Sequence, residues 1–177
     1  KHNSENAMAA IAVAQLLGIE QINIKKALAS FKGIKRRFER IHENASVAYI
    51  DDYAHHPTEL DAAIDAARQL FPDRKITGIF QPHLFSRTQD FADGFAAALD
   101  QLDQILLMDI YPARELPIEG VSSQIIFDKM TNSNCQLVTK ANLMEVLATK
   151  ELDVLLTLGA GDIDTFVQPI KSMLINE

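Results

Sequence analysis

The chain has 177 residues, of which 24 are acidic and 17 basic, and its formal net charge is −7. Apolar residues make up 47% of the chain and charged residues 23%, which is typical of a globular domain with an ordinary core and excludes a disordered tail. The acidic balance gives no electrostatic reason to bind a nucleic-acid backbone, so we expect no nucleic-acid partner.

The sequence offers no signal for a membrane. No apolar stretch reaches the roughly 18 residues that span a bilayer, and the amino end is polar where a signal peptide would turn apolar. The single cysteine, Cys135, cannot form an internal disulfide, which fits a reducing cytoplasm. We therefore expect a cytoplasmic protein that does not contact a membrane. Because Met is absent from position 1, we interpret the chain as a fragment or an excised domain.

Two helical patterns open the chain. Residues 6–17 are rich in Ala, Ile, Val and Leu and stop at Gly18, with Asn3 or Ser4 available as a cap. Apolar residues at helical spacing then run from residue 22 to residue 31 before Gly33. These two helices are expected to close one unit, which we place at residues 1–40.

From about residue 41 the pattern changes to short apolar runs that alternate with helical stretches. This alternation predicts an α/β fold, a mostly parallel sheet with helices on both faces, preceded by the short helical segment. The candidate strands are 47–50, 76–80, 105–110, 136–138 and 154–158, and the candidate helices are 57–70, 89–99, 122–130, 141–148 and 163–174. Ligands of such sheets bind at the carboxyl ends of the strands, so the strand ends are the places to search.

A polar cluster of Asp51, Asp52, His55 and His56 follows the first of these strands, just before Pro57. Two carboxylates and two imidazoles can bind a metal, hold ribose hydroxyls or position an amine for proton transfer. The alternative is that Asp52 or His56 caps the next helix while the others are solvated. Adjacent aspartates on a strand point to opposite sides, which weighs against a shared metal.

A second polar group, including His83 and Arg87, follows the next strand. A guanidinium group matches two oxygens, so Arg87 is suited to grip a carboxylate or a phosphate. The alternative is a helix-start arginine paired with Asp90 or Asp93.

A third candidate is the turn Gly159-Ala160-Gly161-Asp162, which precedes a helix. Its backbone N–H groups could face an anion, although Asp162 is equally suited to cap the helix. The chain holds no GxxxxGK[ST] phosphate loop, so any ATP chemistry needs parts that lie elsewhere.

Together these motifs resemble the Mur ligase family, and most closely its branch that joins L-alanine to UDP-N-acetylmuramate. The motifs are His2-Asn3-x-x-Asn6-Ala7, Arg36-Arg37-Phe38, the run DDYAHHPTE from Asp51 to Glu59, Phe80-Gln81-Pro82-His83, and Leu158-Gly159-Ala160-Gly161-Asp162-Ile163. They cover essentially the whole chain in order, and DDYAHHPTE is the most specific of them.

The resemblance implies a C-terminal fragment of an ATP-dependent ligase of peptidoglycan precursor synthesis. Residues 1–40 would be the tail of the central ATP-binding domain, and residues 41–177 the Rossmann-like C-terminal domain that binds the amino acid. ATP and Mg²⁺ would activate the muramate carboxylate as an acyl phosphate, which the amine of L-alanine attacks. Both would be bound mainly by the upstream part, so the fragment alone is expected to be inactive.

The same resemblance assigns roles to individual residues and no metal ligand. Asn3 and Asn6 would lie by the adenine, and Arg37 and Asp52 by the ribose and phosphates. His55 would be catalytic and would face the amino acid. The other implied substrate contacts are His56, His83, Arg87, Gly159, Gly161 and Asp162.

One position departs from the commoner family pattern. Leu84 stands where relatives carry an arginine that resembles part of the carboxylate grip. Either Arg87 holds the alanine carboxylate alone or another cation replaces the missing one, and Arg114 is the candidate.

Three other functions remain open. The first is the recycling ligase that joins the same sugar to a tripeptide, although the FQPH and DIYPARE stretches favour the alanine enzyme. The second is a non-catalytic domain of the same fold that binds a nucleotide or an amino acid. The third is a metal-dependent hydrolase built on the Asp51 to His56 cluster.

Overall fold

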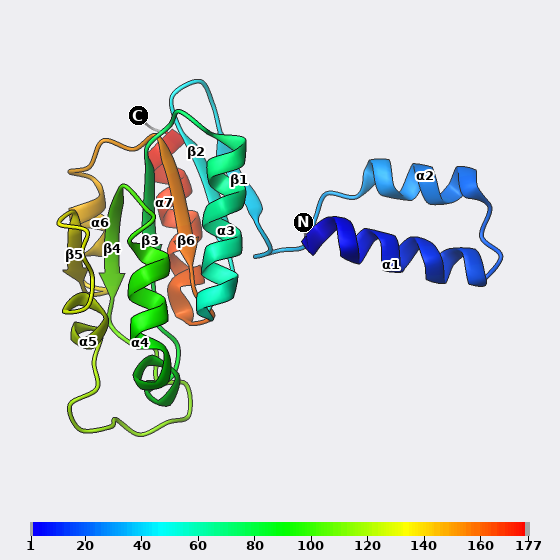
Figure 1. Ribbon diagram of the computed structural model, residues 1–177. Coiled ribbons are helices and arrows are strands. Elements are labelled where there is room, and N and C mark those ends of the chain that lie inside the picture. The colour runs from blue at the N-terminus through cyan, green and yellow to red at the C-terminus, as the bar shows by residue number, and fades with distance from the viewer. Residues whose placement is uncertain (1, 176–177) are drawn as a thin grey trace. The chain divides into compact units, whose positions relative to one another are not determined.

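The computed structural model describes the backbone of residues 2–175 and the side chains of residues 5–175. The side chain of Asn3 therefore lies outside the described residues. The chain forms two compact units, the first ending at Gly33 and the second beginning at Ile34 (Figure 1). Within the described residues, no helix is long and apolar enough to cross a membrane.

The first unit is a pair of helices, α1 (His2–Leu16) and α2 (Gln21–Ser30). Gly18, at φ 73°, makes the turn between them and donates its N–H to the carbonyl of Gln15. Large apolar side chains on this unit stay exposed, including Leu16 at 88% and Leu17 at 73%. Two helices alone thus leave apolar surface that their own packing does not cover.

The second unit is built on a six-stranded sheet in the order β1-β2-β6-β3-β4-β5 (Figure 1). The strands are β1 (Glu39–Glu43), β2 (Ala48–Asp52), β3 (Ile76–Phe80), β4 (Gln104–Met108), β5 (Cys135–Val138) and β6 (Val154–Leu158). All neighbouring strands pair in parallel except the edge strand β1, which runs antiparallel to β2. The predicted mostly parallel sheet is confirmed.

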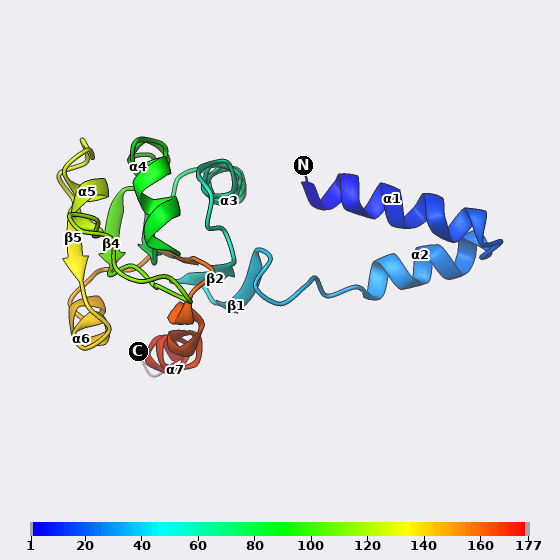
Figure 2. The ribbon, with the colours of Figure 1, turned by 90° about the horizontal axis from the view of Figure 1, so that it is seen from below.

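Helices cover both faces of the sheet, as predicted. Figure 2 shows α3 (Pro57–Leu70), α4 (Phe85–Leu99) and α5 (Gln124–Phe127) on one face, and α6 (Leu143–Leu147) and α7 (Val167–Ile175) on the other. A short 3₁₀ helix, Asp162–Phe166, leads into α7. All five residues of β3 and of β6 are buried, because both strands are covered from both sides.

Each face of the sheet has its own core. Ile50, Leu60 and Phe95 belong to the cluster under α3 and α4, while Tyr49 and Ile170 belong to the cluster under α7. Ile50 and Tyr49 are neighbours on β2, so the strand alternates its side chains between the two cores.

Helix α3 has the predicted bounds, but the bounds predicted for α4 and α5 were wrong. Helix α4 begins at Phe85 and not at residue 89. Non-helical dihedrals at Phe91 (φ −118°, ψ 17°) kink the helix, so its first turns do not continue the apolar spacing of the later ones. Helix α5 is only four residues long. It is short because Lys129 and Met130 already donate to carbonyls three residues back, in tighter turns.

The two phenylalanines of α4 provide a test of the core. Phe95 is fully buried and its ring centroid lies 5.3 Å from that of Phe80, whereas Phe91 is 38% exposed. We expect Phe95→Ala to lower the free energy of unfolding by about 3–5 kcal/mol and Phe91→Ala by clearly less. Urea unfolding of both variants measures the difference, and equal losses would contradict the assigned core.

Candidate functional site

The carboxyl ends of three neighbouring strands, β2, β6 and β3, lie at the same level of the sheet, and the loops that follow them lead to opposite faces. We call this C-terminal side of the sheet its edge below, as distinct from the edge strand β1. The chain leaves β2 and β3 toward α3 and α4, but leaves β6, which lies between them, toward α7 on the other face (Figure 2). Loops that diverge in this way open a crevice at the carboxyl ends of the strands, where ligands of open α/β sheets bind. The segments at this edge are 53–55, 81–83 and 159–162.

A row of rings lines this edge. The ring centroids of Tyr53 and His55 are 5.2 Å apart, those of His55 and His83 6.1 Å, and those of His83 and Tyr111 5.7 Å. The last pair is stacked, with an interplanar angle of 26°. These side chains come from the loops after β2, β3 and β4, so the topology assembles them from three parts of the sequence.

The hydrogen bonds of His55 fix its tautomer. Its Nδ1 lies 2.9 Å from the carbonyl oxygen of Tyr53 and 3.2 Å from Oε2 of Glu59. Because these oxygens only accept, Nδ1 carries the proton, and in the neutral ring Nε2 keeps its lone pair. Glu59 also accepts the backbone N–H of His55, at 2.9 Å, which holds the loop in place. His55 can therefore accept a proton or a hydrogen bond at Nε2.

His83 and Arg87 each have a buried nitrogen without a partner. Nδ1 of His83 and Nη1 of Arg87 make no hydrogen bond within the described part of the chain. Burial lowers the pKa of His83, and the positive charge of Arg87 and the ring of His55 add to this effect, while Glu115 opposes it. A neutral imidazole beside an unsatisfied guanidinium is suited to bind an anionic oxygen, because each orphaned nitrogen costs free energy until a ligand fills it.

Glu115 caps the helix that carries Arg87. Its Oε1 accepts the hydroxyl of Ser86 at 2.5 Å and its Oε2 the backbone N–H of Ser86 at 3.0 Å. These bonds lower the pKa of Glu115. The cap is needed because Leu84, in the N-cap position at φ 72°, provides no side-chain hydrogen bond. The predicted substitute cation, Arg114, is exposed and has no partner among the described residues.

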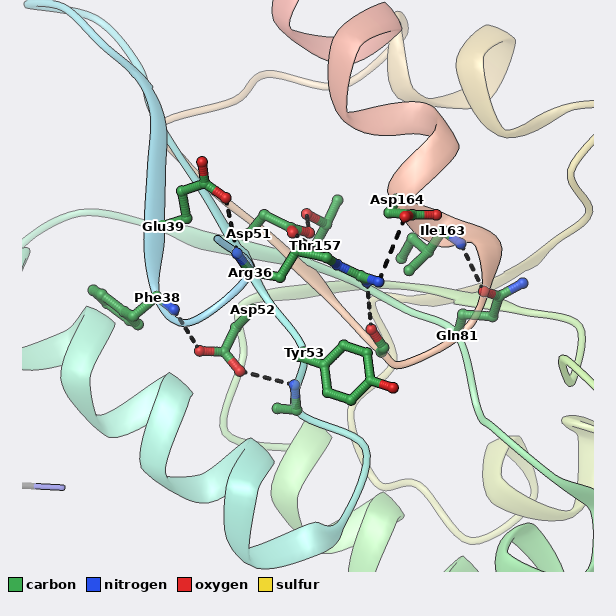
Figure 3. Close-up of polar contacts among 12 residues, drawn as sticks. Arg36, Phe38, Glu39, Asp51, Asp52, Tyr53, Gln81, Thr157, Ile163 and Asp164 are labelled. Atoms are coloured by element: carbon green, nitrogen blue, oxygen red, sulfur yellow. Dashed lines mark hydrogen bonds and ion pairs between the residues drawn. The ribbon is translucent and has the colours of Figure 1, made fainter. Parts of the chain in front are cut away.

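The remaining residues after β2 have mostly structural contacts. His56 is the N-cap of α3, with Nδ1 accepting from the backbone N–H of Thr58 at 3.4 Å, which is the alternative that the sequence left open. Asp52 accepts the N–H of Phe38 at 2.7 Å and that of Ala54 at 2.8 Å (Figure 3). Burial raises the pKa of Asp52, and these two hydrogen bonds oppose the rise.

The two adjacent aspartates point to opposite sides of β2, as predicted. Asp51 accepts the hydroxyl of Thr157 at 2.6 Å and the Nε–H of Arg36 at 3.1 Å, away from Asp52 (Figure 3). Within the described residues, no group of three or more His, Cys, Asp or Glu side chains is placed to hold a metal ion. The cluster that suggested a metal-dependent hydrolase is therefore divided between the two faces.

The glycines after β6 permit a close approach of the loop after β3. A Cβ atom on Gly159 would lie 2.7 Å from the carbonyl oxygen of Gln81, and one on Gly161 would lie 2.7 Å from Cβ of Tyr111 and would also meet the Gln81 amide. That amide accepts the N–H of Ile163 at 2.9 Å and donates to Asp162 at 2.8 Å. Gln81 thus occupies the turn that the sequence suggested for an anion.

Asn6 and Arg37, two of the residues predicted to contact ATP, are both exposed. Asn6 lies on α1, in the first unit. The guanidinium of Arg37 lies 5.4 Å from the ring centroid of Tyr53 and has no ion pair within the described residues.

Arg36 was not singled out by the sequence, where it looks like one member of a basic run. In the structure its side chain is only 13% exposed and contacts Asp51, Asp164 and the carbonyl of Gly159. One signal in the sequence could have indicated this role. Asp51 and Asp52 were predicted to point to opposite sides of their strand, and an aspartate that points into the fold needs a polar or charged partner.

The chain thus has an α/β domain whose candidate site lies at the carboxyl ends of the central strands. A family model described as "Mur ligase, glutamate ligase domain" matches residues 36–161, more than half of the chain. The chain belongs to the Mur ligase family.

Similar proteins of the same family cover nearly the whole chain. It is 53% identical over 174 residues to the UDP-N-acetylmuramate–L-alanine ligase of Flavobacterium johnsoniae, a match that covers 98% of this chain and 39% of the relative. The crystal structure of UDP-N-acetylmuramate-alanine ligase MurC from Thermotoga maritima matches 99% of this chain and 38% of that chain, with a TM-score of 0.80 and 28% identity. A murein peptide ligase from Psychrobacter arcticus also matches 99% of this chain and 37% of its own, with a TM-score of 0.69 and 25% identity. The chain thus spans less than half the length of these relatives.

The close approach at Gly161 generates a prediction. We expect Gly161→Ala to lower the free energy of unfolding by about 1–3 kcal/mol, because the added methyl group overlaps Tyr111 and Gln81. Urea unfolding measures the loss. Gly120→Ala is the control, since its Cβ would meet nothing within 4 Å and only the positive φ of 76° costs about 1 kcal/mol. Unchanged stability in Gly161→Ala would contradict the packing.

Proposed function

We propose that the chain is the C-terminal part of an ATP-dependent ligase that joins L-alanine to UDP-N-acetylmuramate in peptidoglycan precursor synthesis. The observation that carries the proposal is a pair of buried nitrogens, on His83 and Arg87, that have no hydrogen-bond partner among the described residues. They lie beside His55 in a chain 53% identical to the Flavobacterium johnsoniae ligase of that name. An α-amino acid presents the matching groups, a carboxylate for the guanidinium and an amine for a histidine nitrogen.

In this proposal the edge of the sheet binds and orients L-alanine. Arg87 and His83 hold the carboxylate, and Nε2 of His55 faces the amine and accepts its proton as the amine attacks. The lowered pKa of His83 keeps its ring neutral, so it adds a hydrogen bond without a second positive charge. The other predicted substrate residues support these three indirectly. His56 caps α3, and the turn that contains Gly159, Gly161 and Asp162 packs against Gln81.

The residues proposed for ATP are divided between the two units. In terms of sequence, residues 1–40 would be the tail of the central ATP-binding domain and residues 41–177 the amino-acid domain. In the structure residues 34–40 already belong to the second unit. ATP supplies the activation of the muramate carboxylate as an acyl phosphate. Arg37 fits a phosphate contact, because its guanidinium is exposed and unpaired within the described residues. Asn6 is exposed and thus available to the adenine.

The structure gives less direct support for the proposed ATP contact of Asp52 and for the binding of Mg²⁺. Both Asp52 oxygens already accept backbone N–H groups, so this carboxylate holds the loop that carries Tyr53 and offers only its remaining lone pairs to a ribose. The described residues contain no three-carboxylate or histidine cluster for a metal. The ligands of Mg²⁺ are therefore proposed to come from the substrates and from upstream residues. The partners are small molecules only, namely UDP-N-acetylmuramate, L-alanine and ATP, in the cytoplasm.

Reconstitution tests the function. The full-length protein that contains this chain is expected to form UDP-N-acetylmuramoyl-L-alanine with consumption of ATP, measured by product chromatography, while the chain alone forms none. A panel of L-alanine and the tripeptide separates the recycling ligase, and turnover of the tripeptide in place of L-alanine would contradict the proposal. ATP hydrolysis by the chain alone with both substrates would contradict the division into domains.

The two arginines near the edge give a matched pair of variants. In the full-length enzyme, Arg87→Ala is expected to raise the KM for L-alanine about 10- to 100-fold, the equivalent of one charge-assisted hydrogen-bonded pair, and to leave the KM for ATP within about threefold. Arg114→Ala is expected to change neither constant, because its side chain is exposed and unpaired within the described residues. An equal effect of Arg114→Ala would show that it replaces the arginine absent at Leu84.

A further inference from the structure

Arg36 joins three segments that the sequence keeps far apart. Its Nε donates to Oδ2 of Asp51 at 3.1 Å, its Nη2 donates to the carbonyl oxygen of Gly159 at 2.6 Å, and its Nη1 lies 3.8 Å from Oδ2 of Asp164 (Figure 3). Asp51 lies on β2, Gly159 follows β6, and Asp164 belongs to the 3₁₀ helix. One side chain thus connects β2, the turn after β6 and the 3₁₀ helix.

The contact with Asp51 is a buried ion pair. The Arg36 side chain is 13% exposed and that of Asp51 1%. Burial raises the pKa of Asp51, and hydrogen bonds from Thr157 and Arg36 oppose the rise. Removing Arg36 alone would therefore leave a buried carboxylate without its counter-charge, which destabilises the fold strongly. The same result is expected for any structural ion pair, so stability alone does not reveal a further role.

Other contacts of Arg36 lead to the candidate site. The backbone N–H of Tyr53 donates to the carbonyl oxygen of Arg36 at 2.8 Å, and the Arg36 guanidinium lies 5.1 Å from the Tyr53 ring centroid. The Tyr53 carbonyl in turn accepts the Nδ1 proton of His55. Arg36 itself has a positive φ of 58°, a conformation that non-glycine residues adopt only where the surroundings hold it.

We propose that Arg36 is a positioning residue of the amino-acid site: it holds Tyr53 and the Gly159 carbonyl so that His55 is presented to the amine of the substrate. The inference rests on the proposed function. It separates the two adjacent arginines, since the Arg36 side chain is only 13% exposed and contacts three other residues, whereas Arg37 is exposed and has no ion pair within the described residues.

Charge-compensated variants of the full-length enzyme test this role. Arg36→Met is expected to lower Tm and to raise the KM for L-alanine about tenfold, with the KM for ATP within about twofold. The double variant Arg36→Met/Asp51→Asn removes both buried charges and is expected to regain most of Tm but not the KM for L-alanine. Arg36→Lys keeps a charge near Asp51 but lacks the fork that also reaches Gly159, so it should keep more of Tm than Arg36→Met while its KM stays raised.

The control is Arg40→Met. Arg40 lies four residues after Arg36, its side chain is 56% exposed, and within the described residues its only ion pair is with Glu43. Both KM values and Tm should stay close to those of the wild type. If Arg36→Met/Asp51→Asn regains the KM together with Tm, Arg36 only neutralises Asp51 and the inference is overturned. An unchanged KM in Arg36→Met would overturn it as well.

If the wild-type enzyme is inactive with L-alanine, the proposed function fails and the KM values cannot be measured. A histidine resonance still tests whether Arg36 positions His55. The Cε1–H signal of His55, assigned with His55→Gln, is measured by proton NMR in wild-type and Arg36→Lys proteins. A shift of this signal, with that of His42 unchanged, is expected if Arg36 holds Tyr53 against His55. Identical spectra would overturn the inference.

Discussion

The site depends on the insertion of β6 between β2 and β3. This last strand pairs in parallel with both neighbours, so Asp52, Phe80 and Leu158 end at the same level of the sheet. Parallel pairing of residues this distant in sequence carries a large entropic cost, which burial of both faces of β3 and β6 offsets. The glycine turn that follows β6 lies against Gln81, and the carbonyl oxygen of Gly159 in this turn accepts a hydrogen bond from Arg36.

Three carboxylates near this edge already have partners within the protein. Asp51 is paired with Arg36, Asp52 accepts backbone N–H groups, and Glu115 caps the helix of Arg87. These three carboxylates are therefore already satisfied, while Arg87 keeps a buried nitrogen that has no hydrogen-bond partner among the described residues. We propose that an anionic ligand completes this site, because its oxygen supplies the missing hydrogen-bond acceptor.

Sequence periodicity predicted most of the elements, but not how they are connected in space. Helix α3 was predictable because His56 and Pro57 mark its start locally. The start of α4 at Phe85 is instead capped by Glu115, which lies far along the chain and accepts the N–H of Ser86. Strand order follows from tertiary pairing, so the central position of β6 was hidden. The glycine turn looked like an anion site, since nothing local shows that Gln81 approaches it.

The site residues divide in the same way. His55, His83 and the loop of Arg87 were predictable from the rule that strand ends carry ligands, and the structure brings the two histidines within 6.1 Å. The role of Arg36 was not predictable, because nothing in the run Lys35-Arg36-Arg37 indicates which of the two arginines is covered and which is exposed. The burial of Arg36 is set by Asp51 and Gly159, which lie 15 and 123 positions away.

The central claim is that the edge formed by His55, His83 and Arg87 receives an amino acid. A crystal structure of the full-length enzyme with L-alanine tests it most directly. The account predicts a carboxylate oxygen within hydrogen-bond distance of Arg87 Nη1 and the amine next to His55 Nε2. Alanine bound elsewhere, with Arg87 Nη1 and His83 Nδ1 still unpartnered, would contradict it.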